Sequence, residues 1–291
     1  MYPDGAAEPG RVCLAIRGDR VLVSSALPCD WFLVRAVPGA YDDSGAEWTA
    51  GSDTLLYAVT MLAAGGSSFS FEAGGKSSGL PDVGTFYIAA TFSGAGMPDT
   101  IACRDPLQDV SPSVVQVAVR PGDGYLDYLY EAMGTPFIMG PRSTPSGGHQ
   151  ADDRLGFDCA GLAVYGARRM GLEIPYLGPV GILPYLDPVS EGLLSPVEAD
   201  GEVLYRSASG DPAEIGTGGI RPGDLLHFRC QVSVFLEDAG VPGVLDPQDI
   251  VIQSWFDGPM VCTLEENGFY GLPLRVFRWG RTTSSSTPAE Q

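Results

Sequence analysis

One cysteine stands where a nucleophile would need to be. Cys159 lies in the stretch GFDCAGLAVYGARRMG, which runs from Gly156 to Gly171. Apolar residues recur at helical spacing, so the stretch predicts a helix from Cys159 to about Met170, with Asp158 as its N-cap and Gly171 just past its end. A helix N-terminus stabilises a thiolate, and a nucleophilic cysteine needs that stabilisation. The alternative is an ordinary thiol buried on a helix.

A catalytic thiol also needs a base, and the chain has only two histidines, His149 and His227. His149 lies in a loop rich in Pro, Gly and Ser, ten positions before Cys159. A loop can bring an imidazole to an active site, but most histidines in loops are solvated. Three aspartates near the cysteine, at positions 152, 153 and 158, would raise the pKa of a nearby thiol, which opposes activation.

His227 ends the apolar run DLLHF, just before Arg229 and Cys230. If these two residues form a two-residue hairpin turn, Phe228 faces Gln231 and His227 points to the opposite face of the sheet. A bulge or another turn would reverse that direction. The pattern favours a partly buried structural histidine over a catalytic one.

Length and composition allow one large domain or two ordinary ones in 291 residues. The chain is 44% hydrophobic, with 39 glycines and 24 prolines, which is typical of a globular protein with many turns. No apolar run reaches the ~18 residues of a membrane span. The first residues, MYPDGAAEPGR, lack the apolar core of a signal peptide, so the sequence as given shows none.

The net charge of −19, with Lys76 as the single lysine, argues against nucleic acid and anionic membranes as partners. Six cysteines without a CxxC motif, beside two histidines, give a zinc cluster little support. The phosphate-loop lysine, a GxGxxG after a strand and the EF-hand spacing are all missing. We therefore expect no cofactor and no metal. The acidic surface reads as one that keeps the protein soluble.

The first half of the chain predicts short strands separated by turns. Gly18 and Asp19 join two apolar runs as a candidate hairpin, and DTLLYAVTMLAA is either a strand or a helix. Strands at this spacing predict an all-β, sandwich-like domain over residues 1–121. The other predicted strands are DWFLVRAVP, SSFSFEAGG, GTFYIAATFSG, DTIACRD and SVVQVAVRP.

The second half predicts an α+β domain over residues 122–281. Apolar residues at helical spacing predict a helix that begins near Tyr125 and ends at Gly134, ahead of the cysteine helix. An irregular stretch then runs to about residue 220. The predicted strands are GDLLHF, QVSVFLED, DIVIQSWF, MVCTLEE and LRVFRW, and the tail at residues 282–291 is predicted to be disordered.

Four segments in this half resemble the NlpC/P60 family, cell-wall hydrolases of papain-like fold. FDCAGL is similar to the family's cysteine motif DCSGLV, and RPGDLLHF to its PGDLLFF strand. QVSVFLEDAG corresponds to the family's HVGIYLG strand, which carries the catalytic histidine. DIVIQSWFDG corresponds to the family's strand that carries the residue orienting this histidine. GTPFIMG is similar to GTPYVWGG. The match covers roughly residues 122–280, and the resemblance implies Cys159 as nucleophile.

The departures from the family pattern fall on the catalytic groups. Gln231 takes the position of the catalytic histidine, and Gln253 that of the residue that orients it. Phe137 replaces the tyrosine that helps at the oxyanion site, and Met139 replaces a tryptophan. A glutamine amide takes no proton near neutral pH, so Gln231 can neither deprotonate Cys159 nor protonate a leaving amine. Gln231 and Gln253 could instead hydrogen-bond across neighbouring strands.

The resemblance implies one of two functions. The first is a cysteine hydrolase that cleaves peptide or amide bonds of peptidoglycan through an acyl-enzyme on Cys159, with His227 or His149 as an atypical base. The second is a catalytically inactive module that binds cell-wall peptide or a protein partner. The implied ligand is a peptidoglycan stem peptide or another peptide-like molecule, and the implied location is the cell envelope or outside the cell. The sequence leaves the oligomeric state open.

Overall fold

The structure, a computed structural model, describes residues 6–7, 12–37, 57–75, 79–92, 114–140, 143–144, 147–199 and 201–280. The predicted strand DTIACRD and the predicted disordered tail at 282–291 lie outside these residues. Contacts divide the chain into two compact units. The first holds residues 1–158 and 254–260, and the second holds residues 159–253 and 261–291. The domain boundary predicted at residues 121 and 122 stays a prediction.

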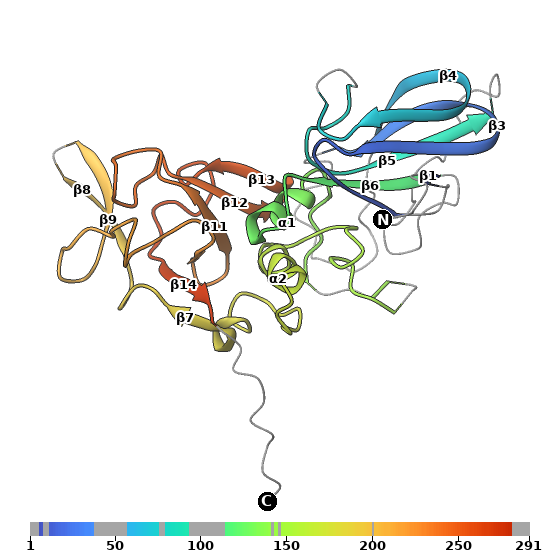
Figure 1. Cartoon of the computed structure of the whole chain (residues 1–291). Helices are drawn as coiled ribbons and strands as arrows, with labels where there is room; N and C mark the ends of the chain where they lie inside the picture. Colours follow the sequence, from blue (N-terminus) through green and yellow to red (C-terminus); the bar gives the residue numbers. More distant parts are fainter. Residues whose placement is uncertain are drawn as a thin grey trace, which may run out of the picture. The chain divides into compact units, whose positions relative to one another are not determined.

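The first unit contains a six-stranded sheet whose order is β1-β3-β5-β6-β2, with β4 paired to β3 (Figure 1). Its strands contribute alternate apolar side chains to a core around Trp31, Phe86 and Val117, which are almost fully buried. The described part of DTLLYAVTMLAA, which begins at Tyr57, is therefore strand, not helix, and it continues through SSFSFE as one long strand. The strands are β1 Ala6–Ala7, β2 Val12–Ile16, β3 Arg20–Ala36, β4 Tyr57–Glu72, β5 Gly84–Phe92 and β6 Val114–Arg120.

The hairpin predicted at Gly18 and Asp19 is wrong in its pairing. The turn itself forms, since Asp19 N–H donates to the Ile16 carbonyl and Gly18 adopts φ +94°. The two strands that it joins do not pair with each other: β2 runs parallel to β6, while β3 pairs with β1, β4 and β5. Turn chemistry fixes a local reversal, but the strand partners are set by distant apolar faces that share one core.

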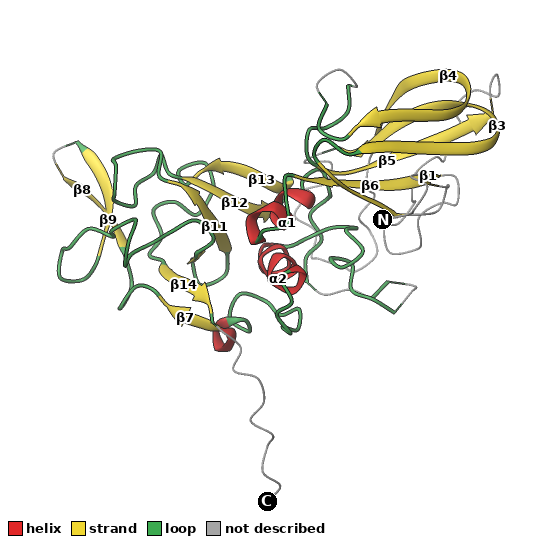
Figure 2. Cartoon of the chain, viewed as in Figure 1, coloured by secondary structure: helices red, strands yellow, loops and turns green. Residues whose placement is uncertain are grey.

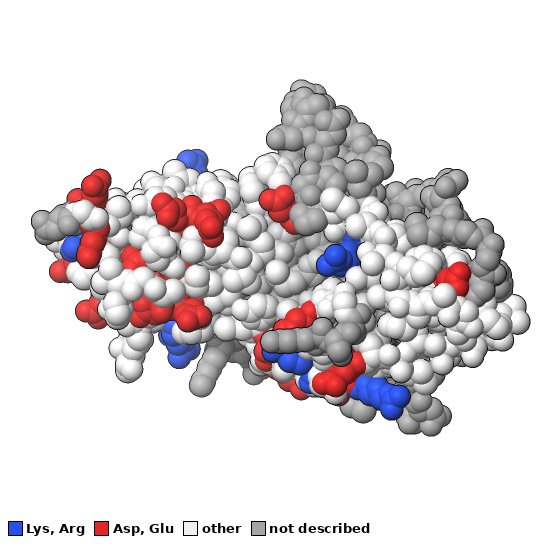
Figure 3. All heavy atoms as spheres, turned by 90° about the horizontal axis from the view of Figure 1, so that it is seen from above, with Lys and Arg blue, Asp and Glu red and all other residues white. Residues whose placement is uncertain are grey.

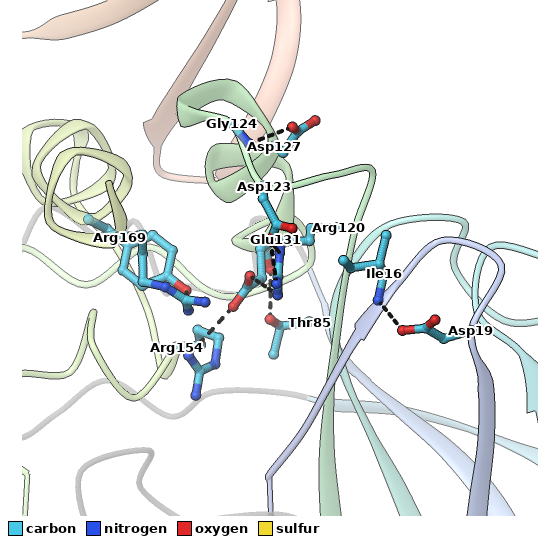
Figure 4. A network of polar contacts seen from close by, with 11 residues as sticks. Ile16, Asp19, Thr85, Arg120, Asp123, Gly124, Asp127, Glu131, Arg154 and Arg169 are labelled. Atoms are coloured by element: carbon cyan, nitrogen blue, oxygen red, sulfur yellow. Dashed lines mark hydrogen bonds and ion pairs between the residues drawn. The ribbon is translucent and has the colours of Figure 1, made fainter. Parts of the chain in front are cut away.

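Helix α1, Tyr125–Glu131, confirms the predicted helix, and a buried ionic cluster ties it to the sheet. The Glu131 carboxylate is fully buried and lies 3.4 Å from an Arg120 guanidinium nitrogen and 3.5 Å from one of Arg154. Thr85 on β5 donates its hydroxyl to the Glu131 carbonyl at 2.7 Å, as Figure 4 shows. Strand, helix and the loop before residue 158 thus meet at one carboxylate.

The second unit begins with helix α2, Cys159–Arg169, which matches the prediction to within one residue. The helix ends just before Gly171, as the sequence predicted. Gly171, at φ +88°, donates to the Arg168 carbonyl, and Leu172 donates to that of Ala167. These two bonds form the Schellman arrangement, which needs the left-handed conformation that glycine adopts without strain.

A second sheet follows, in the order β13-β12-β11-β10-β14-β7 (Figure 2). All the strands predicted after residue 220 are present as β10 Leu225–His227, β11 Val232–Glu237, β12 Ile250–Trp255, β13 Gly258–Thr263 and β14 Arg275–Trp279. The stretch predicted as irregular also holds structure: η1 Leu183–Tyr185, β7 Leu186–Pro188 and a separate pair, β8 Ser195–Ala199 with β9 Glu202–Arg206. Pro188 and Pro196 lie within two of these strands and weakened the signal there.

The structure is rich in strand, with mixed sheets and two α-helices among the described residues. That composition is compatible with the predicted α+β class. Within the described part of the chain, no helix is long and apolar enough to cross a membrane. Acidic side chains are spread over the face in Figure 3, with few basic ones among them.

Replacing Glu131 by Gln removes the negative charge that compensates two guanidiniums buried in the first unit. Loss of one partner from a buried ionic cluster costs about 3–5 kcal/mol. We expect the free energy of unfolding, measured by urea titration, to fall by that amount. Asp82→Asn, which breaks the exposed pair between Arg17 and Asp82, is the control and should cost less than about 1 kcal/mol. Equal losses of unfolding free energy in the two variants would show that the buried ionic cluster stabilises the protein no more than an exposed ion pair does.

Candidate functional site

Cys159 is the first residue of α2, and its side chain is 7% exposed. The helix packs against β11, the strand that Gln231 immediately precedes. Every residue from Cys159 to Ala167 is buried, and small residues at 160, 161 and 163 let the helix approach its neighbours closely. The helix therefore gives the thiol a fixed place at its N-terminus, as the sequence predicted.

Gln231 and Gln253 form the central polar contact of the second unit. The Gln231 amide nitrogen donates to the Gln253 side-chain oxygen at 3.0 Å, and both side chains are at least 98% buried. Ser233, two residues further along the same strand face, donates its hydroxyl to that same oxygen at 3.2 Å. The cross-strand amide pair inferred from the sequence is thus present.

The nitrogen of the Gln253 amide is held as well. It donates to the Asn267 carbonyl at 3.0 Å and lies 3.9 Å from the Cys262 sulfur. Burial, with Glu266 nearby, raises the pKa of the Cys262 thiol to about 11, so that sulfur stays protonated. Each polar atom of the Gln253 amide has a protein partner, and the amide is fixed in one orientation.

His227 is held away from the glutamine pair. Its Nε2 lies 3.0 Å from the Pro179 carbonyl, and its Nδ1 accepts the Arg229 N–H at 3.2 Å. The turn after it is the two-residue hairpin, one of the alternatives that the sequence left open, because Phe228 N–H donates to the Gln231 carbonyl and His227 is in register with Val232. Neighbouring residues of a strand point to opposite faces, so His227 and Gln231 do not share one.

The bonds of His227 define a neutral imidazole. A hydrogen on Nε2 satisfies the Pro179 carbonyl, and an unprotonated Nδ1 accepts from Arg229. Burial lowers the pKa of His227, and the charge of Arg275 lowers it further, while the bond to Pro179 acts in the opposite direction. These contacts match the structural histidine that the sequence favoured.

His149 belongs to the first unit, where its Nδ1 accepts the Ala151 N–H at 3.1 Å. Its backbone pairs with Ser143 in an isolated bridge. The described residues around His149 thus have local backbone hydrogen bonds of their own, such as Thr144 N–H to the Gly148 carbonyl and Asp153 N–H to the His149 carbonyl. A catalytic role for His149 remains a prediction.

Three motif segments converge in the first unit. Phe157 N–H donates to the Pro136 carbonyl at 3.1 Å, and Ile138 N–H donates to the Phe157 carbonyl at 3.2 Å. The same Phe157 carbonyl accepts the Ser254 hydroxyl at 2.7 Å. GTPFIMG, GFD and the end of β12 are thus joined through one residue, two positions before Cys159 in the chain.

Asp158 and the aromatic residues complete this arrangement. The Asp158 carboxylate accepts the N–H of Gly140, which anchors the loop after GTPFIM. Phe137 is 2% exposed, and its ring lies 5.7 Å from those of both Trp255 and Phe256. Its position is apolar and packed, with no hydroxyl to offer an oxyanion, as the sequence indicated.

The sequence reasoning missed Ser233, Asn267 and Ser254 as parts of these networks. One signal could have found Ser233, because Gln231 and Ser233 are the polar positions of an otherwise apolar strand with period two. Asn267 acts through its backbone carbonyl, which no side-chain pattern reveals. Among the described residues, no group of three or more His, Cys, Asp or Glu side chains is placed to hold a metal ion.

Comparison with protein families finds no matching family, and comparison with curated proteins finds no matching sequence. Among solved structures, the crystal structure of an NlpC/P60 family protein from Bacillus cereus is similar to the chain, with 9% identity and a TM-score of 0.28. The similarity covers 90% of this chain and 64% of that one. Similarity this weak does not establish a shared fold, so the proposed relation rests on the motifs and contacts of the chain itself.

Gly258 tests the packing of the GTPF segment. At φ +83°, a Cβ on Gly258 would lie 2.3 Å from the Thr135 carbonyl oxygen, so alanine has to displace backbone. Gly243 has a similar φ of +85° but open space around it. We expect Gly243→Ala to cost about 1 kcal/mol from backbone conformation alone, and Gly258→Ala to cost at least about 2 kcal/mol more. Equal losses in chemical denaturation would contradict the close approach.

His227 should titrate below the ordinary histidine value of about 6.5. The folded state disfavours its charged form, so the histidine contributes stability above the unfolded pKa and loses it as pH falls through that value. Proton NMR can follow the two imidazoles of the chain, with His227→Gln to assign the signals. A pKa above 6.5 would instead indicate an imidazolium paired with an anion such as a thiolate.

Proposed function

We propose that the chain is a catalytically impaired NlpC/P60-like module that binds a cell-wall stem peptide. The observation that carries the proposal is the buried Gln231–Gln253 amide pair at the position of the family's base and its orienting residue. The Gln253 amide finds protein partners for both its oxygen and its nitrogen at that position, and neither glutamine exchanges protons near neutral pH. The class of ligand follows from the motif resemblance.

Magnitudes favour impaired chemistry over an atypical hydrolase. A helix N-terminus stabilises an anion by about 0.3–1 kcal/mol. General acid–base catalysis contributes ~10²–10⁴-fold in rate, which equals about 2.7–5.4 kcal/mol of barrier. Helix α2 therefore supplies the smaller contribution, and the larger one requires an imidazole. His227, one of the two candidates, is bonded to Pro179 and Arg229.

The test is the rate of Cys159 alkylation as a function of pH, followed peptide by peptide in the mass spectrometer. We expect a slow reaction at pH 6–7 whose rate rises with pH and levels off only above about pH 8.5, the behaviour of an ordinary thiol. Gln231→His should raise the rate near pH 6–7 by about tenfold or more, because it returns an imidazole to the position of the base. Cys159→Ala identifies the signal.

His227→Gln is the matched control, since it removes an imidazole where Gln231→His adds one. We expect it to leave Cys159 alkylation unchanged. A fast reaction of the unmodified chain at pH 6–7 that disappears with His227→Gln or His149→Gln would establish the hydrolase with an atypical base. The proposed binding of a stem peptide is tested separately, by calorimetric titration of the chain with such a peptide. Absence of binding would overturn that part of the proposal.

A further inference from the structure

The edge strand β4 is exposed, and its one charged residue is Glu72 at its end. It pairs with β3 along its length, and no other strand pairs with it among the described residues (Figure 1). From Thr54 to Phe71 the chain has no charged side chain, although the whole chain carries 36 acidic and 17 basic residues. Met61 near its middle is 59% exposed. A long edge strand of this kind is a template for pairing with another strand.

The other two outer strands of the same sheet differ from β4. Strand β2 has five residues and lies between Arg11 and Arg17 in the sequence. Strand β1 has two residues and lies between Asp4 and Glu8. Short length and nearby charge are devices with which proteins protect sheet edges. Strand β4 has sixteen residues, and its nearest charged residues, Asp53 and Glu72, leave the run Thr54–Phe71 uncharged. Among the described strands, β4 is therefore the outer strand best suited to pair with another chain.

We infer that two copies of the chain pair antiparallel through the Tyr57–Ala64 segment of β4. Each copy carries a net charge of −19, so most surfaces of two copies repel, and the uncharged Tyr57–Ala64 segment is where they can approach.

The segment suits a two-fold axis. Antiparallel pairing of a strand with its own copy is isologous, so each residue is used twice and the assembly closes at a dimer. Gly65, at φ +70°, interrupts the extended conformation and sets the end of the straight segment. Eight residues span about 27 Å and give about eight hydrogen bonds between the copies. Apart from Met61, the exposed residues of the segment, Ala58, Thr60 and Ala64, are small.

The experiment measures the molar mass by light scattering over about a hundredfold range of concentration. We expect the mass of two chains at the upper end, and hydrogen exchange that slows in Tyr57–Ala64 as the concentration rises. Met61→Glu places two carboxylates across the axis and should give a monomer at every concentration. Leu14→Glu is the matched control, because Leu14 is an exposed apolar residue on β2 and the change in net charge is identical.

A monomer of the unmodified chain throughout this range would overturn the proposal, as would a dimer that Met61→Glu leaves intact. Loss of the dimer in Leu14→Glu to the same degree would also overturn it, because general repulsion would then explain the effect. If Met61→Glu fails to fold, as judged by circular dichroism, Ala58→Glu takes its place. Hydrogen exchange in Tyr57–Ala64 of the unmodified chain tests the pairing independently of any variant. Slower exchange confined to other segments would contradict pairing through β4.

Discussion

The hydrogen bond between Gln231 and Gln253 is the contact on which the interpretation of the second unit depends. It joins the residue before β11 to β12. The oxygen of the Gln253 amide also accepts from Ser233, and its nitrogen donates to the Asn267 carbonyl and lies near the Cys262 sulfur. A buried amide left without partners costs about 1–3 kcal/mol, so these partners stabilise the buried Gln253 side chain. The same bond occupies the place where the resemblance expects proton transfer. A position that stabilises the sheet in this way cannot also serve as a base.

Much of the local structure was predictable because its causes are local. Helix α2 begins at Cys159 and ends before Gly171 because small residues, apolar spacing and a left-handed glycine all lie in one short stretch. The turn after His227 was predictable only as one of two alternatives. A two-residue length places His227 and Gln231 on opposite faces of the sheet, whereas a bulge would have reversed that direction.

Strand partners and backbone contacts were not predictable in this way. The Gly18 turn forms, yet β2 pairs with β6 a hundred residues later, because a strand selects its neighbour through a shared core. Short strands such as β7 and β8 contain prolines and carry little periodicity. The three motif segments meet at Phe157 through hydrogen bonds to backbone carbonyls. Every residue has such a carbonyl, so a pattern of side chains does not predict which one accepts a bond.

Thiolate absorbance tests the central claim most directly. The titration compares the unmodified chain with Cys159→Ala, so the difference reports one sulfur among six cysteines. With an amide pair in place of a base, the difference signal should appear only above about pH 8, as for an ordinary thiol. A difference signal already complete at pH 6 would show an imidazolium–thiolate pair, and it would contradict the proposal that Gln231 and Gln253 stand in place of a catalytic base.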